Sequence, residues 1–293
     1  MKKVSKIVIP VAGLGTRSLP FSKEVPKEML PIIDVPTIHY IVREAVDAGM
    51  DQVIFITGNG KEVLENYFDF SPALEKQLRD RGKHQLAEEL HALGKMCEVI
   101  SVRQKEPLGL GHAVLCARHI VGDERFAVAL GDEIYPNFSH PGVTPLRQLS
   151  DLANSHSGSI VAVQEVPKEK TSLYGIVDVG GHKVGKDPVA VKSAVEKPHP
   201  DKAPSRFAIV GRYLFEAELF AYLQKTKAAS GGEIQLTDAM DAVAKKGDLK
   251  AVTIQTARYD VGSAAGYVQA VVDSALSRPG LAQEIRDYLK GMK

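Results

Sequence analysis

The chain has 293 residues, of which 44% are hydrophobic and 25% are charged, and its formal net charge at pH 7 is +1. This composition is that of an ordinary globular protein, and the length is sufficient to bury a large core. The near-zero charge argues against a broad nucleic-acid-binding surface, which requires a basic excess. We therefore expect no nucleic-acid partner.

The cysteines and the N-terminus indicate the cellular setting. Cys97 and Cys116 do not form a CxxC pair, so neither a zinc ribbon nor a disulfide framework is expected. Unpaired thiols are typical of a reducing compartment, and we expect the cytoplasm. The first apolar run is interrupted by Gly13, Gly15 and Arg17, which indicates a buried strand rather than a signal peptide. No segment approaches the length of a transmembrane helix, so no membrane partner is expected.

The first half of the chain, about 1–158, alternates strand and helix signals. Continuous apolar runs separated by helical patterns predict a parallel sheet covered on both faces. The predicted strands are 7–11, 52–57, 98–103 and 126–130, and the predicted helices are 36–48 and 112–120. The charged stretch 73–94 predicts a solvated helical excursion, with a lid or an oligomer contact as the alternative.

From residue 159 the pattern changes to short runs separated by turn signals, SIVAVQEV, YGIVDV, AVKSAVEK and RFAIVGRYLF. These runs predict a more antiparallel extension, and helical signals return from 217, at 235–244 and from 264 onward. Without a linker or repeat, we expect one domain over 1–293 with a continuous sheet. The predicted fold is α/β: a Rossmann-like, three-layer, mixed but mainly parallel sheet with helices on both faces and a smaller antiparallel extension.

The most informative segment is VAGLGTRSLPFSKEVPKEMLP, residues 11–31, which follows the first predicted strand. Its glycines let the backbone approach a phosphate closely and direct N–H groups at it. Arg17, Lys23 and Lys27 add positive charge that suits a triphosphate. A dinucleotide fingerprint needs a third glycine where Ser18 stands, and no Walker A string is present. The missing glycine weighs against a nicotinamide oxidoreductase.

The pattern GLGTR-x-LP-x(2)-K-x(2)-PKEMLP resembles the signature of sugar-phosphate nucleotidyltransferases, in particular the bacterial UTP–glucose-1-phosphate uridylyltransferases. The resemblance continues in the family's order through RQKEPLGLGHAVLCA, ALGDEI, YGIV, VEKP, VGRYLF, GEIQLTDA and YDVGSAAGYVQA. It implies uridylyl transfer from UTP to glucose 1-phosphate, with UDP-glucose and pyrophosphate as products. The alternatives are a catalytically weak regulatory paralogue and an enzyme for another sugar 1-phosphate.

The resemblance also implies roles for individual residues, with the nucleotide in the half 1–158 and the sugar phosphate in the half 159–293. Arg17, Lys27 and Lys197 are expected to act in catalysis, the first two on the triphosphate and the third on the sugar phosphate. A glutamine amide can both donate to and accept from the uracil edge. The expected nucleotide-binding residues are Ala12, Gly13, Leu14, Gly15, Gln104 and Gly109, and the expected sugar-phosphate-binding residues are Gly175, Glu196, Lys197 and Gly211.

Two aspartates are the expected metal ligands. Asp132 closes the fourth predicted strand, and a carboxylate there lies on the ligand side of a parallel sheet. The resemblance implies that Asp132 and Asp260 together hold Mg²⁺, which prefers hard oxygen ligands. For Asp260, a helix N-cap or turn residue is the alternative, and Glu133 is expected to point elsewhere in an extended chain. The resemblance further implies a homodimer or homotetramer.

Overall fold

The computed structural model describes residues 3–138, 142–229 and 231–292. Within this part of the chain, the main sheet has ten strands in the order β10-β13-β8-β12-β6-β1-β4-β5, and the β9–β11 ribbon joins it through β12. The strands are β1 (Lys6–Pro10), β4 (Gln52–Thr57), β5 (Glu98–Arg103), β6 (Phe126–Ala129), β8 (Ser159–Glu165), β9 (Gly175–Asp178), β10 (Val189–Ala190), β11 (Ser193–Glu196), β12 (Phe207–Phe215) and β13 (Leu249–Thr253).

The first half of the sheet is parallel, as its continuous apolar strands predict. β1 pairs in parallel with β4 and β6, and β4 pairs in parallel with β5. Side chains from both faces of β1 are buried: Ile7 and Ile9 enter one core cluster, and Val8 enters the other. Two cores on one strand require helices on both faces of the sheet.

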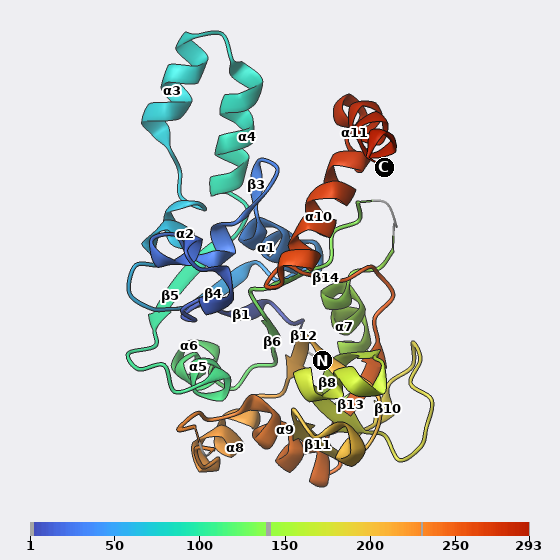
Figure 1. The fold of residues 1–293 in the computed structure, drawn as a ribbon. Helices are drawn as coiled ribbons and strands as arrows, with labels where there is room; N and C mark the ends of the chain where they lie inside the picture. Colours follow the sequence, from blue (N-terminus) through green and yellow to red (C-terminus); the bar gives the residue numbers. More distant parts are fainter. Residues whose placement is uncertain (1–2, 139–141, 230, 293) are drawn as a thin grey trace.

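Helices cover both faces, so the predicted three-layer α/β fold is confirmed (Figure 1). One core contains side chains from α1 (Thr37–Asp47), α7 (Pro145–Ala153) and α10 (Ala264–Ser277). The other contains side chains from α5 (Leu110–Cys116), α6 (Arg118–Val121), α8 (Leu219–Lys225) and α9 (Leu236–Lys245).

Two details differ from the predicted elements. The single helix predicted over 112–120 is two helices, because the chain tightens at Ala117, whose N–H donates to the carbonyl of Val114 three residues earlier. The sheet also gains β13, which the sequence pattern does not predict and which pairs in parallel with β8.

Strand β12 joins the two halves of the chain. It pairs antiparallel with β6 of the first half and with β8 and β9 of the second. The expected continuous sheet is therefore confirmed. The β9–β11 pair is an antiparallel ribbon beside β12, and it forms the smaller extension predicted from the sequence.

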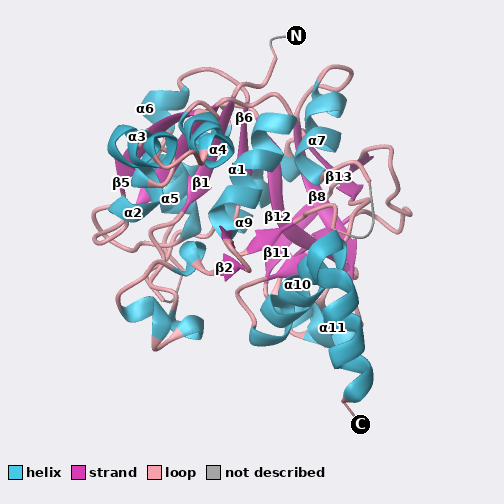
Figure 2. Cartoon of the chain, turned by 90° about the horizontal axis from the view of Figure 1, so that it is seen from above, coloured by secondary structure: helices cyan, strands magenta, loops and turns pink. Residues whose placement is uncertain are grey.

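The charged excursion is an αα-hairpin, α3 (Pro72–Asp80) and α4 (His84–Gly94), that projects from the body as an arm after the short helix α2 (Glu62–Asn66). α10 and α11 (Pro279–Gly291) also project from the body, and Figure 2 shows them leading to the C-terminus. Across the described ranges, no helix is long and apolar enough to cross a membrane.

Candidate active site

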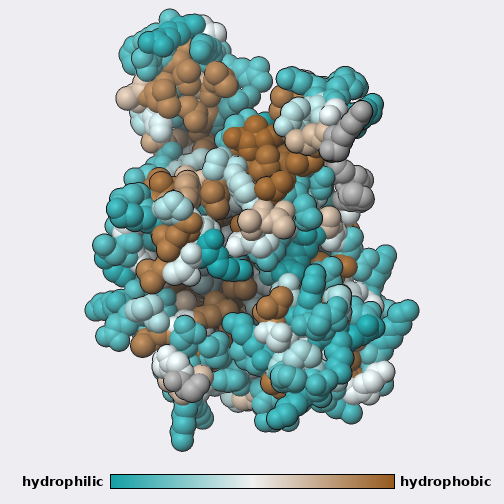
Figure 3. Space-filling view, in the orientation of Figure 1, coloured by the Kyte–Doolittle hydropathy of each residue, from teal (hydrophilic) through white to brown (hydrophobic). Residues whose placement is uncertain are grey.

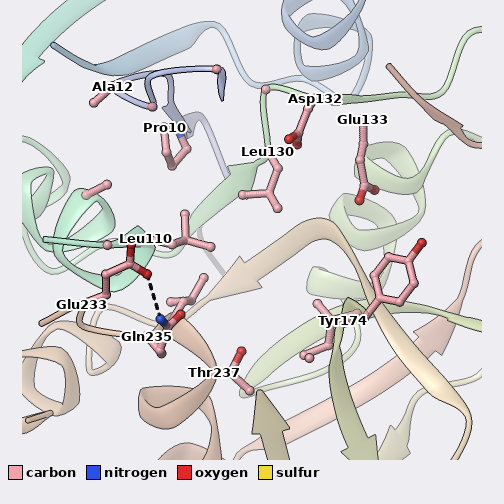
Figure 4. A pocket seen from close by; sticks show the side chains of 18 of the residues that line it. Pro10, Ala12, Leu110, Leu130, Asp132, Glu133, Tyr174, Glu233, Gln235 and Thr237 are labelled. Atoms are coloured by element: carbon pink, nitrogen blue, oxygen red, sulfur yellow. Dashed lines mark hydrogen bonds between the residues drawn. The ribbon is translucent and has the colours of Figure 1, made fainter. Parts of the chain in front are cut away.

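A cavity of about 570 Å³ opens beyond the ends of β1 and β6, and its far wall includes the start of α9. Figure 4 shows Asp132 and Glu133 on one side of this cavity and Gln235 and Thr237 on the other. All the expected site residues except Gly211 line its wall: Ala12, Gly13, Leu14, Gly15, Arg17, Lys27, Gln104, Gly109, Asp132, Gly175, Glu196, Lys197 and Asp260.

The glycine loop after β1 folds back on itself at Gly15. This residue is in the left-handed region (φ 65°), and a Cβ there would lie 3.1 Å from Cβ of Ser22 and 3.3 Å from Cβ of Lys27. The Ser22 hydroxyl donates to the Gly15 carbonyl at 2.7 Å, which closes the loop. A side chain would be both strained and crowded at Gly15, so the turn requires glycine.

The loop presents open backbone and two cations to the cavity. Nothing lies within 4 Å of a Cβ built at Gly13, and Leu14 is 75% exposed. The Lys27 ammonium and the Arg17 guanidinium each lie 2.9 Å from Oδ2 of Asp132. Burial opposes ionisation of Asp132, but the Lys27 and Arg17 charges outweigh it and lower the pKa of this carboxyl. Asp132 therefore remains a carboxylate at neutral pH.

Asp260 reaches the same region through a short strand pair. β7 (Glu133–Ile134) pairs antiparallel with β14 (Tyr259–Asp260), with Asp260 opposite Glu133. A Cβ at Gly262 would lie 3.2 Å from Oδ2 of Asp132, and the Gly262 N–H donates to Oδ1 of Asp260 at 3.1 Å. Gly262 thus stands between two aspartates, Asp132 and Asp260, that come from opposite halves of the chain.

The N-cap of α10 is Ser263, whose hydroxyl accepts from the Gly266 N–H at 3.2 Å. Asp260 makes a turn hydrogen bond but does not cap the helix. No group of three or more His, Cys, Asp or Glu side chains that could hold a metal ion occurs in the ranges that the structure describes. Two carboxylates nevertheless fit Mg²⁺, which takes few protein carboxylates and completes its octahedron with substrate oxygens and water.

Glu133 was expected to point elsewhere in an extended chain, but residues 131–132 form a turn, and Glu133 lines the same side of the cavity as Asp132 (Figure 4). It forms a two-point ion pair with Arg258, with Nη2–Oε1 at 2.8 Å and Nε–Oε2 at 3.0 Å. The Tyr135 hydroxyl also donates to Glu133 at 2.8 Å. The Arg258 guanidinium lies over the Tyr174 ring, 5.1 Å from its centroid, so this network forms the cavity wall near the β9–β11 ribbon.

On the side expected to bind the base, Gln104 and Gly109 lie together. The Gln104 side-chain amide donates to the Gly109 carbonyl at 3.1 Å and contacts Nδ1 of His112 at 3.0 Å. Gly109 is in the left-handed region (φ 92°), and a Cβ there would lie 2.9 Å from the Ile234 carbonyl. Gly109 thus allows the segment around Ile234 to pack against the loop that carries Gln104.

On the side expected to bind the sugar, Glu196 is held by α9. Its Oε2 accepts from the Thr237 hydroxyl at 2.6 Å, and a Cβ at Gly175 would lie 3.2 Å from the same oxygen. Lys197 follows with a left-handed backbone (φ 42°), which sends its side chain outward to 62% exposure. Its ammonium lies 3.5 Å from Oε1 of Glu196.

Gly211 is not brought to this wall. Its φ is +47°, and a Cβ there would lie 3.1 Å from the Glu133 carboxyl carbon and 3.2 Å from Cβ of Leu130. In this structure the glycine allows β12 to pack closely against the chain after β6, and the sugar-phosphate binding expected of Gly211 stays a prediction.

Several residues of the site were not assigned from the sequence. Glu28 is fully buried, and its Oε2 accepts from the Lys61 ammonium at 2.9 Å. Burial, opposed by Lys61 and Lys27, raises the pKa of Glu28. The strings KEML and GEIQLTDA contain Glu28 and Thr237 and could have indicated them. Lys61 and Arg258 stand outside the quoted motifs, so no local signal identifies them.

Comparison with known proteins gives consistent results. Residues 6–275 match the family described as nucleotidyl transferase. The chain is 45% identical over 292 residues to the UTP–glucose-1-phosphate uridylyltransferase of Bacillus subtilis (strain 168), covering 100% of this chain and 98% of that relative. It is similar to the UTP-bound UGPase of Acinetobacter baumannii, with 40% identity, a TM-score of 0.90, and coverage of 99% and 100% of the two chains. It is also similar to a UDP-glucose pyrophosphorylase complexed with UDP-glucose, with 38% identity, a TM-score of 0.83, and coverage of 94% and 100%.

Proposed function

The chain belongs to the nucleotidyl transferase family, and from this membership we propose that it transfers uridylyl from UTP to glucose 1-phosphate, giving UDP-glucose and pyrophosphate. The observation that carries the proposal is one cavity lined by the glycine loop, its cations, both aspartates and the Glu196–Thr237 pair. The relatives named above include one bound to UTP and one complexed with UDP-glucose, the substrate and product of this reaction.

The reaction makes and breaks one bond at phosphorus. A phosphate oxygen of glucose 1-phosphate attacks the α-phosphorus of UTP, and the bond to the oxygen bridging the α- and β-phosphorus atoms breaks. Pyrophosphate leaves with that electron pair. Because both reactants are anionic, catalysis consists mainly of positioning and charge stabilisation. Arg17, Lys27 and Lys197 supply that positive charge, and no protein nucleophile is needed.

We also propose Asp132 and Asp260 as ligands of Mg²⁺. When bound, Mg²⁺ neutralises and orients phosphate oxygens. The protein's own contribution is an exchange of partners: Lys27 and Arg17 now neutralise Asp132, and both cations are flexible side chains that can turn to a triphosphate. When UTP binds, Lys27 and Arg17 can pair with its phosphates and so leave the Asp132 carboxylate free for the metal.

The ends of the cavity divide recognition between base and sugar. We assign the uracil edge to Gln104, which the Gly109 carbonyl and His112 hold in place. We assign sugar hydroxyls to Glu196, whose orientation is fixed by Thr237. The ordering of both side chains before ligand arrives reduces the entropy that binding must supply.

Three further proposals concern the whole chain. We propose that residues 1–293 act as one domain, since the sheet crosses both halves. We propose a cytoplasmic location, consistent with the free thiols Cys97 and Cys116.

We propose a homodimer or homotetramer that uses the C-terminal helices. Figure 3 shows apolar surface over α10, and Val268 and Tyr288 are 57% and 62% exposed. Light scattering in solution tests the last proposal.

A pyrophosphate-release assay tests the function. UTP, ATP, GTP and dTTP are each paired with glucose 1-phosphate, and UTP is then paired with galactose 1-phosphate. We expect strong preference for UTP with glucose 1-phosphate, because a site that hydrogen-bonds one base edge leaves its polar groups unpaired with another. Equal turnover with dTTP would contradict the assignment of UTP. UTP binding without turnover would favour the regulatory alternative, and faster reaction of galactose 1-phosphate would change the sugar.

A further inference from the structure

Arg212 is a charged side chain in the apolar core. It lies in β12 with 0% exposure, and its neighbours Val210 and Leu214 belong to the core cluster on the α1 face of the sheet. Its Nε and Nη2 donate to Oε2 of Glu44 on α1 at 3.0 and 2.9 Å. The Glu44 side chain is only 3% exposed, so the pair is desolvated.

The other donors of this guanidinium reach the backbone on both sides of Asp132. Nη1 donates to the Leu130 carbonyl at 3.3 Å and to the Gly211 carbonyl at 3.0 Å. Nη2 donates to the Glu133 carbonyl at 2.8 Å. Leu130 and Glu133 enclose Gly131 and Asp132, which lie in the connection between β6 and β7. One side chain therefore holds both ends of the turn that carries the Asp132 carboxylate.

The clamp is anchored in rigid elements. Oε1 of Glu44 accepts from the Leu146 N–H at the start of α7, at 3.0 Å, so Glu44 connects α1, α7 and β12. The Arg212 guanidinium also lies over the Tyr135 ring, 4.7 Å from its centroid. Side chains held in this way by helices and strands define the geometry of a site more closely than loops do.

A buried ion pair is weak evidence for stability. Removing two charges from water is costly, and apolar replacements of similar volume are often neutral or stabilising. The hydrogen bonds of Arg212 give another reason for a charged residue at this position. An apolar side chain could not hold the Leu130 and Glu133 carbonyls.

We propose that Arg212, oriented by Glu44, is a positioning residue that fixes the Gly131–Asp132 turn and so the direction of the Asp132 carboxylate. The inference rests on the proposed function, in which Asp132 binds the metal. Its consequence is specific: loosening the clamp weakens metal affinity and turnover beyond what the loss of folding stability explains. Residues that orient a metal ligand typically contribute about 10- to 100-fold to metal affinity.

The chain offers a matched control at the opposite end of β6. Arg125 is also a largely buried arginine, 11% exposed, and it pairs with Glu216 at 2.8 Å. It donates to the carbonyls of Ala153 and Gly158, both at 2.8 Å, and of His156 at 3.2 Å. Arg125→Lys and Arg212→Lys therefore each shorten an arginine clamp on backbone carbonyls, but only the second clamp holds the Asp132 turn.

The experiment measures Mn²⁺ affinity by electron paramagnetic resonance with a non-hydrolysable UTP analogue present, and stability by urea unfolding. We expect Arg212→Lys to weaken Mn²⁺ binding by about 10- to 100-fold and to lower kcat, while Arg125→Lys loses stability and binds Mn²⁺ within a few-fold of the unsubstituted protein. Equal Mn²⁺ affinity in the two folded variants would overturn the proposal, as would unchanged affinity in Asp132→Asn.

A second variant covers the case in which Arg212→Lys does not fold. Glu44→Gln keeps an oxygen acceptor of nearly the same size for the guanidinium, and we expect it to weaken Mn²⁺ affinity in the same direction by a smaller factor. Unchanged Mn²⁺ affinity in Glu44→Gln would then overturn the proposal. The proposed function is tested separately by turnover of the unsubstituted protein with UTP and glucose 1-phosphate, so that each failure is recognised on its own.

Discussion

The Lys27 ammonium lies 2.9 Å from Oδ2 of Asp132, and the Arg17 guanidinium reaches the same oxygen. Two cations on one carboxylate oxygen neutralise a group proposed to bind a metal. Metal and lysine therefore compete for Asp132 in the free protein, and a bound triphosphate relieves that competition by attracting both cations.

This competition predicts opposite effects of one substitution. In Lys27→Met, we expect the free protein to bind Mn²⁺ more tightly, because a competing cation is gone. Turnover should nevertheless fall by about 10²- to 10³-fold, the usual effect of removing one group that stabilises transition-state charge. Mn²⁺ titration of the free protein and steady-state kinetics measure the two effects. Lys76→Met, on the arm, is the control, and weaker Mn²⁺ binding in Lys27→Met would contradict the exchange.

The role of Asp260 can be separated from capping of α10. In Asp260→Asn, we expect turnover to fall, the Mg²⁺ requirement to rise and the melting temperature to change little, since asparagine can still accept from the Gly262 N–H. The matched control is Ser263→Ala, which removes the observed cap. It should lose about 0.5–2 kcal/mol of stability and keep its Mg²⁺ dependence. Unchanged Mg²⁺ dependence in Asp260→Asn would leave Asp132 as the remaining proposed ligand.

Lys197 is expected to act on the sugar phosphate and not on UTP. Truncating one partner of a buried charge pair costs roughly 2–5 kcal/mol. Because the Lys197 side chain is 62% exposed before ligand binds, we expect the lower limit, about 2 kcal/mol or roughly 30-fold in kcat/KM for glucose 1-phosphate. The variant is Lys197→Met, and calorimetry should show unchanged UTP affinity. Lys202→Met is an exposed control nearby, and normal kinetics in Lys197→Met would remove this residue from the site.

The buried Glu28–Lys61 pair predicts a pH-dependent stability. Burial raises the pKa of Glu28 above 4.5 despite Lys61 and Lys27. The folded state then binds this proton more readily than the unfolded state, so the contribution of Glu28 to stability increases as pH falls from neutral toward 4.5. Urea unfolding at pH 7, 6 and 5 should show the unsubstituted protein gaining stability relative to Glu28→Gln as pH falls. A constant difference would show that Glu28 does not titrate in this range.

The same pair provides a check on the cause. Glu28→Gln removes the desolvation cost of the carboxylate together with its attraction to the Lys61 ammonium, which is 10% exposed, and the raised pKa of Glu28 indicates that the desolvation cost is the larger. We therefore expect Glu28→Gln to be no less stable than the unsubstituted protein at pH 7. Glu28→Gln combined with Lys61→Met also removes the ammonium that has lost its partner, so it should be more stable than Glu28→Gln alone. A double variant no more stable than the single one would show that the unpartnered ammonium costs nothing.

The sequence alone determined the elements whose pattern is local and repeated. The bounds of β4 and β5 agree with the predicted strands because these apolar runs have polar neighbours at both ends. The motifs also identified most of the cavity wall. A glycine loop that contains lysines and an arginine within about twenty residues indicates phosphate binding without any knowledge of the tertiary structure. β13 was missed because LKAVT is short and partly polar, and it becomes a strand only by pairing with β8.

The tertiary structure decided what depends on distant partners. The β7–β14 pairing brings Asp260 to the chain segment of Asp132, and packing against Glu133 and Leu130 gives Gly211 a role that its motif did not indicate. The sequence does not indicate the Glu44–Arg212 pair, because the local sequence around each residue does not show whether its charged side chain is buried or exposed. Folding brings these distant residues together and excludes water from them. A charge buried in this way needs a partner of opposite charge or a hydrogen-bonding group, and here the partner comes from a distant part of the chain.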